Sequence, residues 1–159
     1  MTTIQKTKNE SIVLAIIELA AQMLKKGSNL TSMIGLTTQQ WMVLLYVQGD
    51  RNIPYSEERF QDGGILASDI AEALNVSRPN ITNLLQVLSD KGLVKQEKDS
   101  RDKRRKVLVL TRKGEEAIAK VHPLRENSNL RLLYDFSEEE KEDLLQKLMH
   151  CLDRMHGRI

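Results

Sequence analysis

The spacing of apolar and polar residues along this chain predicts a mainly helical protein. Between residues 11 and 25 apolar side chains occupy nearly every face, and neither glycine nor proline interrupts them. This pattern predicts a helix that is buried on more than one side, begins after Asn9 and ends or kinks at Gly27. The small domain that follows can cover only part of such a helix, so the helix needs a further partner surface.

A second helix is predicted over 38–49, with Thr37 or Thr38 as its cap and with Trp41, Leu44, Leu45 and Val47 in the core. A polar connecting loop follows at 50–64. It is long for a compact helical domain, in which such links usually run to about 2–8 residues. We expect a surface loop with one helical turn at Ser56–Phe60. It is either a plain insertion or a cover for a ligand pocket.

Two short helices separated by a tight break come next. The first covers 67–74, with Ile70, Ala71 and Leu74 on one face, and Asn75-Val76-Ser77 ends it. Ser77 is the expected cap of the second helix, which runs from Arg78 to about Lys91 with Pro79 in its first turn. Its inward stripe comprises Ile81, Leu84, Leu85 and Leu88, and Gly92 ends it.

The rest of the chain predicts a β-hairpin and two further helices. Strands at 93–98 and 106–111 enclose the charged tip 99–105. Thr111 caps a helix that begins at Arg112 and that Pro123 kinks. Ser137 and Glu140 form a capping box for the last helix. The inward residues predicted for these two helices are Ala117, Ile118, Val121, Leu144, Leu145, Leu148, Met149 and Leu152.

Helix, short break, helix and basic hairpin, in this order, predict a winged helix-turn-helix that binds double-stranded DNA. The break lets the second helix present its first turns to a major groove, and an arginine on a narrow hairpin can enter the minor groove. The predicted DNA-binding residues are Ser77, Arg78, Pro79, Asn80, Thr82, Asn83, Gln86, Arg101, Lys103 and Arg104. Asp102 is predicted to stiffen the tip by pairing with Arg104.

The charge distribution supports this interpretation. Residues 78–113 hold eleven Lys or Arg and four Asp or Glu, a local net charge of +7 in a chain whose total is +2. One concentrated basic face is typical of a polyanion-binding protein. The aromatic content of 4% argues against a base-stacking platform for single strands.

These segments resemble the MarR family of bacterial regulators, named after multiple antibiotic resistance. The resemblance covers nearly the whole chain, and its most specific part is an Asp-x-Arg hairpin followed by Leu-Thr-x-x-Gly. The residues that carry it lie at 36–41, 69–77, 81–85, 91–94, 102–104, 108–114 and 136–140. Asn83 departs from the arginine that the family often has there, which leaves Arg78 as an alternative for phosphate contact or base reading.

The resemblance implies a homodimer whose first and last helices interlock. Residues 1–36 and 123–159 are then dimerisation helices, and 37–122 form the DNA-binding domain. The dimer would bind a near-palindromic operator, with its two recognition helices about one DNA turn apart. The expected function is transcriptional repression relieved by a small-molecule effector. A winged-helix module for protein contacts is the alternative.

Other chemistry has little support in the sequence. His122, His150, Cys151 and His156 lack the spacing of a metal site, and we expect polar helix residues there and a buried or partly buried thiol. No catalytic constellation, cofactor motif or membrane span stands out, so we expect no enzyme, cofactor or metal. The single cysteine and the polar residues 1–10 fit a cytoplasmic protein.

Overall fold

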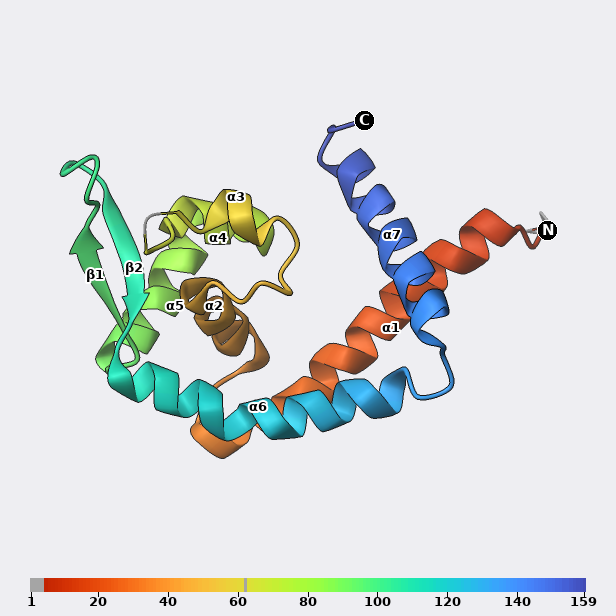
Figure 1. Ribbon diagram of the computed structural model, residues 1–159, viewed down its shortest axis with the longest axis horizontal. Helices are drawn as coiled ribbons and strands as arrows, with labels where there is room; N and C mark the ends of the chain where they lie inside the picture. The colour runs from red at the N-terminus through yellow and green to blue at the C-terminus, as the bar shows by residue number, and fades with distance from the viewer. Residues whose placement is uncertain (1–4, 62) are drawn as a thin grey trace, which may run out of the picture.

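The computed structural model describes residues 5–61 and 63–159 as a compact lobe with a helical arm (Figure 1). We refer to residues 37–122 as the lobe and to residues 5–36 and 123–159 as the arm. The mainly helical fold with one antiparallel hairpin that the sequence predicts is confirmed. The elements are α1 (Lys8–Thr31), η1 (Ser32–Ile34), α2 (Thr38–Gln48), α3 (Ser56–Arg59), α4 (Ala67–Ala73), α5 (Arg78–Asp90), β1 (Val94–Lys98), β2 (Lys106–Leu110), α6 (Arg112–Leu132) and α7 (Glu138–Met155).

The hydrophobic core lies within the lobe. The inward stripe predicted for α5 is buried, as are Trp41 and the predicted inward residues of α2. Leu74 and Ala117 are partly buried against this core. The largest fully buried apolar side chains come from α2, the end of the connecting loop, α4, α5 and α6: Val43, Leu44, Ile65, Ile70, Leu88 and Val121.

Side-chain caps begin the helices where the sequence predicts. Thr37 and Ser137 each form a capping box with the Gln or Glu three residues later. The Ser77 hydroxyl accepts the amide of Asn80 at 3.3 Å, and Thr111 accepts the amide of Gly114 at 3.1 Å. Each cap satisfies an amide that has no partner within its helix, so local chemistry is enough to set these boundaries.

The hairpin is fixed to the start of α6 by a close backbone approach. β1 and β2 pair antiparallel from Val94–Leu110 to Lys98–Lys106. Gly114 lies so near the hairpin that a Cβ atom there would come within 2.2 Å of the Leu93 carbonyl oxygen. The Thr111 hydroxyl also donates to the Gly92 carbonyl at 2.6 Å. The direction of the hairpin is therefore set by α6.

The first helix differs from its prediction at both ends. Thr7 caps α1, which begins at Lys8 and continues through Gly27 to Thr31. Gly27 faces the start of α2, where an added Cβ would make an ordinary contact with Thr38 at 3.4 Å, and the Thr38 hydroxyl donates to the Leu24 carbonyl at 3.1 Å. The glycine therefore lies within the helix and does not end it. α6 likewise remains helical through Pro123.

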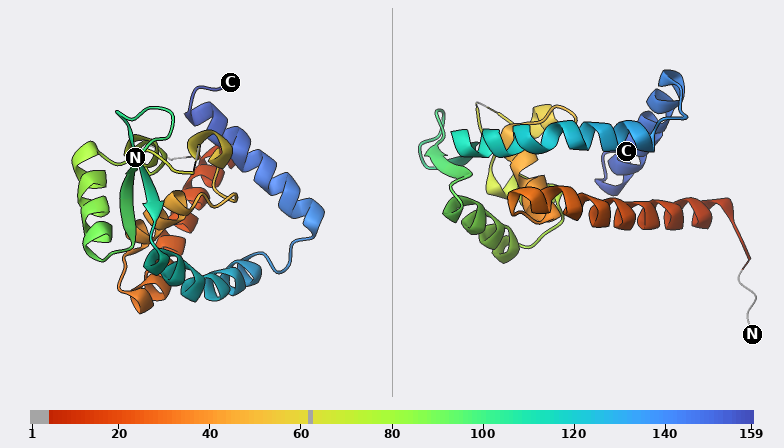
Figure 2. Two further views of the ribbon diagram at one scale, coloured as in Figure 1. Left: turned by 60° about the vertical axis from the view of Figure 1, so that its left-hand side comes forward. Right: turned by 90° about the horizontal axis from the view of Figure 1, so that it is seen from below.

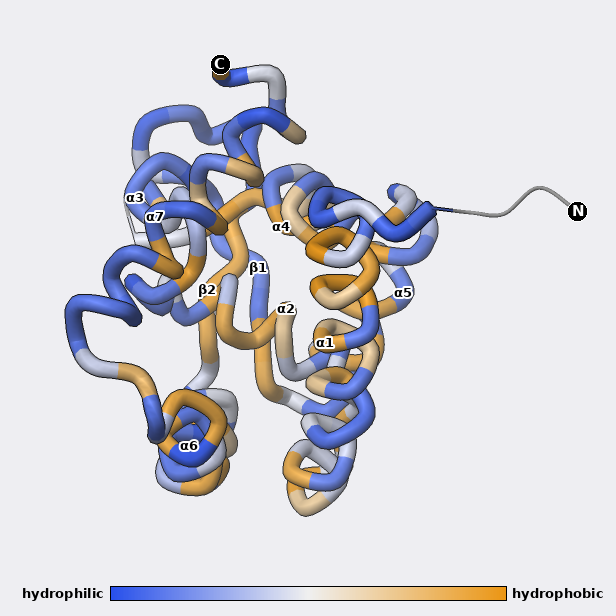
Figure 3. Tube along the Cα trace, turned by 90° about the vertical axis from the view of Figure 1, so that its right-hand side faces the viewer, coloured by the Kyte–Doolittle hydropathy of each residue, from blue (hydrophilic) through white to orange (hydrophobic). Residues whose placement is uncertain are grey.

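The arm carries its apolar side chains on its surface. α1 and the second half of α6 leave the lobe together and α7 turns back (Figure 2). Hydrophobic residues run along much of α1 (Figure 3), yet Ile17 is 60% exposed and Thr31 is the one fully buried residue of that helix. The predicted burial of the inward residues of α7 is wrong for the single chain: Leu145 and Leu148 are exposed, and Leu144, Met149 and Leu152 are only half-buried.

Candidate nucleic-acid interface

A tight turn sets α5 at a steep angle to α4. Asn75 adopts a positive φ of 51°, a conformation that asparagine tolerates better than most residues, and Ser77 then begins the next helix. Pro79 occupies the first turn, where a missing amide hydrogen breaks no helical bond. The buried stripe of α5 faces the core, so its opposite side points away from the lobe.

The predicted recognition residues of α5 are all exposed: Ser77, Arg78, Pro79, Asn80, Thr82, Asn83 and Gln86. Three of them already make hydrogen bonds. Ser77 caps the helix, the Thr82 hydroxyl donates to the Arg78 carbonyl at 2.9 Å, and the Gln86 amide donates to Asp90 at 2.7 Å. Among the described residues, the side chains of Arg78, Asn80 and Asn83 make no such bond. These three keep their full hydrogen-bonding capacity for a ligand.

Two aspartates order the hairpin tip. Asp99 accepts the amide of Arg101 and Asp102 accepts the amide of Arg104, each at 2.9 Å. Asp102 therefore stiffens the tip through the backbone of Arg104, whereas the sequence predicted a pairing with its guanidinium group. Arg101, Lys103 and Arg104 are exposed on this ordered turn. A turn held in this way presents its cations at a defined position.

The start of α5 and the hairpin tip lie at the same end of the lobe (Figures 1 and 2). The charged residues of 78–113 that give the local net charge of +7 belong to these two elements and their flanks. Proteins that bind duplex DNA commonly present a helix with polar side chains to the major groove and basic side chains to the minor groove.

A polar cavity of about 310 Å³ lies beside the hairpin tip. Asp69, in the first turn of α4, lines it together with Arg59 and Arg105. Burial raises the pKa of the Asp69 carboxyl above its ordinary value, although the nearby Arg105 acts in the opposite direction. The positive charge of Arg105, at the end of the tip, is thus partly balanced by the Asp69 carboxylate of α4.

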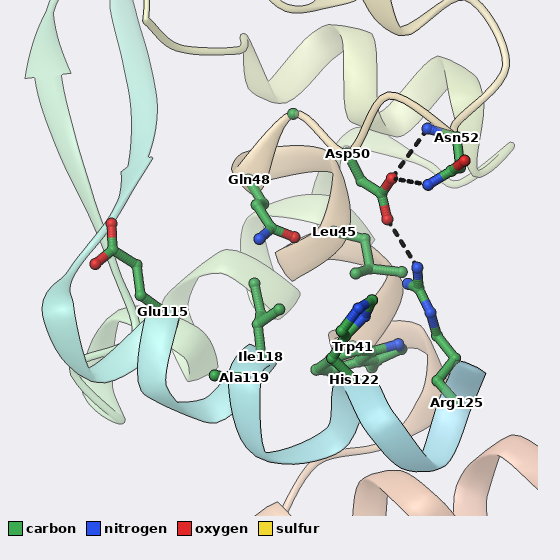
Figure 4. A pocket seen from close by; sticks show the side chains of 11 residues that line it. Trp41, Leu45, Gln48, Asp50, Asn52, Glu115, Ile118, Ala119, His122 and Arg125 are labelled. Carbon is green, nitrogen blue, oxygen red and sulfur yellow. Dashed lines mark hydrogen bonds and ion pairs between the residues drawn. The ribbon is translucent and has the colours of Figure 1, made fainter. Parts of the chain in front are cut away.

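A second cavity, of about 450 Å³, lies between α2 and α6 (Figure 4). Trp41, Ile118 and His122 line it, and Arg125 reaches from α6 toward Asp50. The Arg125 guanidinium lies 2.9 Å from the Asp50 carboxylate, which also accepts two hydrogen bonds from Asn52. Burial raises the pKa of Asp50, but these hydrogen bonds outweigh it and hold the pKa below its ordinary value.

The connecting loop makes contacts that the sequence analysis missed. α3 confirms the predicted single helical turn, and the loop also reaches α7, where the Tyr55 hydroxyl donates to Asp153 at 2.6 Å and Arg158 binds Glu58. These partners lie 98 and 100 positions apart. No local pattern links residues at such a separation, although the opposite charges of Glu58 and Arg158 are compatible with pairing.

The histidines and the cysteine have different surroundings. The ring of His150 accepts a hydrogen bond from Arg154, whereas His156 packs edge-on against Tyr55. Cys151 is exposed, so the prediction of a buried or half-buried thiol is wrong for the single chain, in which little of α7 is covered. Within residues 5–61 and 63–159 there is no cluster of three metal-ligating side chains and no helix both long and apolar enough to cross a bilayer.

Known proteins resemble this chain in sequence and fold. A family model described as "MarR family" matches residues 34–105. The transcriptional activatory protein BadR of Rhodopseudomonas palustris is 31% identical over 136 residues, covering 82% of this chain and 70% of BadR. The HTH-type transcriptional regulator YwoH of Bacillus subtilis is 29% identical over 134 residues, covering 84% and 88%. The crystal structure of an S. aureus MepR–DNA complex matches with a TM-score of 0.74 and 23% identity, covering 94% and 99%.

Proposed function

This chain is a transcriptional regulator of the MarR family, and we propose that it acts as a homodimer that binds a near-palindromic operator and represses the genes beside it. The observation that carries the proposal is the common end of the lobe at which the polar side of α5 and the basic hairpin tip lie (Figure 1). MepR, whose fold this chain shares, has been crystallised with DNA.

In this proposal the two elements have different tasks. Arg78, Asn80 and Asn83 reach base edges in the major groove, where amide and guanidinium groups can form paired hydrogen bonds with adenine and guanine. Thr82, Gln86, Ser77 and Pro79 complete this contact surface. Arg101, Lys103 and Arg104 approach the minor groove and its phosphates, which supplies affinity with little base discrimination.

The exposed apolar residues of the arm support a homodimer. Ile12, Val13, Leu14 and Ile17 are each more than half exposed on α1, and Leu145 is 55% exposed on α7. Exposed apolar surface of this kind on two long helices is typical of an obligate interface. A second copy, which carries the same surface, would bury these side chains by interlocking its own α1 and α7 with them.

The cavity between α2 and α6 is a candidate effector site. It lies where the lobe meets the arm, and its volume of about 450 Å³ suits a small organic molecule. Binding there would favour one angle between lobe and arm, and thereby one spacing of the two recognition helices. Repression would be relieved if that spacing no longer matched the operator. Because the relative BadR is named an activatory protein, activation is the second candidate outcome.

The DNA-binding proposal is tested by selecting duplexes from a random pool and titrating the selected operator. We expect Arg104→Ala to weaken binding to all duplexes and to lower the slope of log affinity against log salt by about 1. The matched control is Lys120→Ala, which removes one positive charge from α6 and should leave the slope unchanged. An unaltered affinity and slope for Arg104→Ala would refute the role of the hairpin. A reporter gene behind the selected operator then distinguishes repression from activation.

A further inference from the structure

The connecting loop is attached to α6 and to α7 in the arm. Near its start Asp50 pairs with Arg125 of α6 at 2.9 Å. Further along, the Tyr55 hydroxyl donates to Asp153 of α7 at 2.6 Å. Arg158, just beyond α7, donates two hydrogen bonds to Glu58 at 3.0 and 2.9 Å. Each of these contacts joins residues at least 75 positions apart, so the loop brings together remote parts of the chain.

The contact around Tyr55 is an ordered cluster. The Arg158 guanidinium lies 3.9 Å from the centroid of the Tyr55 ring, and the His156 ring meets the tyrosine edge-on at 5.6 Å. Tyr55 itself has a positive φ of 58°, a left-handed conformation that is unfavourable for a residue with a side chain. Such a conformation persists where the surroundings hold it, and here the hydroxyl, the ring and the neighbouring glutamate all have partners in the arm.

The two ends of the loop are fixed to the lobe. Gly49, directly before the loop, lies against the ring of Phe60, and an added Cβ on this glycine would come within 2.8 Å of the ring. At its end Ile65 pairs with Leu108 of β2, with a hydrogen bond of 2.8 Å from the Leu108 amide to the Ile65 carbonyl. A Cβ on Gly64 would clash with Val107 at 2.6 Å. The loop is therefore seated on the hairpin that carries the basic tip.

We propose that the connecting loop is a strap that fixes the angle between lobe and arm, and that Tyr55, Glu58, Asp153 and Arg158 are positioning residues for operator binding. None of the four belongs to the proposed DNA contact surface. They act by holding the hairpin and α5 at a constant place relative to the arm. This inference rests on the proposed homodimer, because the arm is what sets the distance between the two copies of α5.

The effect of the strap on operator affinity follows from preorganisation of the dimer. A near-palindromic operator demands one spacing of two recognition helices, and a dimer whose lobes swing freely must lose that freedom when it binds. A strap that restricts the lobes before binding lowers this entropic penalty. Loss of the strap should therefore weaken operator binding. It should leave non-specific binding, which tolerates many spacings, nearly unchanged.

The first test compares two neighbouring glutamates of α3. Glu58→Ala breaks the contact with Arg158, whereas Glu57→Ala removes the same charge from the same helical turn without breaking a described contact. For Glu58→Ala we expect operator affinity to fall about fivefold or more. Arg158→Ala should lower operator affinity by a similar factor. The double variant should lose no more affinity than either single variant. Equal affinities for the two glutamate variants, additive losses, or a gain in affinity for Glu58→Ala would overturn the proposal.

The second test measures the spacing itself. With Cys151→Ser as the background, a spin label at Lys103→Cys reports the distance between the two hairpin tips of a dimer by pulsed electron spin resonance. We expect a broader distance distribution for Glu58→Ala than for Glu57→Ala or the unaltered strap. Identical distributions would show that the loop is a plain insertion. Sedimentation distinguishes the two failures: a monomer refutes the proposed dimer, whereas an intact dimer with unchanged distances refutes the strap.

Discussion

The lobe and the arm of this protein use their apolar residues in opposite ways. In the lobe, Leu44, Ile70 and Leu88 are fully buried within a single chain. In the arm, Ile17 and Leu24 are 60% and 56% exposed, and the described residues of α7 contribute no buried side chain. Long helices of both regions begin with a side-chain cap, as at Thr37 and Ser77 in the lobe and at Thr7 and Ser137 in the arm. The difference therefore lies in tertiary packing and not in local structure.

This contrast indicates a division of labour. A lobe with its own core keeps the helix-turn-helix in shape whatever its partner does, whereas an arm with an uncovered apolar surface depends on a second copy. In the proposed dimer, DNA contact belongs to the first region and assembly to the second. Their junction, at the cavity and the connecting loop, is where one can influence the other.

The largest effect is expected in the core of the lobe. Leu88→Ala removes a fully buried side chain, which should lower the free energy of unfolding by about 2–5 kcal/mol because a cavity is left behind. Chemical denaturation followed by circular dichroism measures this loss, which should not depend on protein concentration. Leu19→Ala, at an exposed position of α1, is the comparison. If Leu19→Ala lowered the free energy of unfolding by as much, and equally at every protein concentration, the contrast between the two regions would be wrong.

In the arm, a charge should act on assembly and not on the fold. Ile17→Asp places a carboxylate on the exposed apolar surface of α1. Burying that charge in an interface is unfavourable, so the dissociation constant of the dimer should rise about 30-fold or more. Sedimentation velocity over a dilution series measures it. Gln22→Asp, at an exposed polar position of the same helix, should leave assembly unchanged, and a similar shift for both variants would refute this surface as the interface.

A smaller effect is expected at the recognition helix. Asn83→Ala removes an exposed amide that makes no hydrogen bond within the described part of the protein. Discrimination at one base pair of each half-site should fall by about 1–3 kcal/mol, while affinity for unrelated DNA stays constant. Titration of the selected operator against single-pair variants measures this. Ser89→Ala, near the end of α5, serves as the control. Unchanged discrimination would leave Arg78 as the main reader of base edges.

The smallest effect is expected at the junction of lobe and arm. Because the folded-state pKa of Asp50 lies below the ordinary 3.8, its hydrogen bonds stabilise the fold fully above pH 3.8 and cease to do so as the pH falls through the lowered pKa. Asp50→Asn weakens the bond from Arg125 and should cost about 1–2 kcal/mol near neutral pH. Thermal unfolding as a function of pH should show the two proteins converging in acid. A constant difference down to pH 2 would contradict the sign of this shift.

Local chemistry made much of the lobe predictable. Ser77 and Pro79 mark the start of α5, and the spacing of Ile81, Leu84, Leu85 and Leu88 identifies its buried side. The predicted recognition residues are exposed for the same reason, since they occupy the opposite side of one helix. The predicted strands and the cap at Thr111 also appear within one residue of their expected bounds. Each of these features depends on residues only a few positions apart.

Features that depend on distant partners were not predictable. Gly27 was expected to end or kink a helix, but α1 continues past it to the point where Thr38 of α2 binds the Leu24 carbonyl. The apolar residues of α7 were expected to be buried, but periodicity identifies an apolar side without identifying what covers it. The pairing of Glu58 with Arg158 requires two segments 100 positions apart to meet.

By itself, the sequence determined the order of the helices, their caps, the polar side of α5 and the basic tip of the hairpin, because these follow from interactions within a few residues. The tertiary structure alone decided that the helix-turn-helix and the hairpin present one common end. It also decided that the apolar surface of the arm stays uncovered and that the connecting loop binds both α6 and α7. These properties arise from packing between remote segments, for which the local pattern of residues contains no distance information.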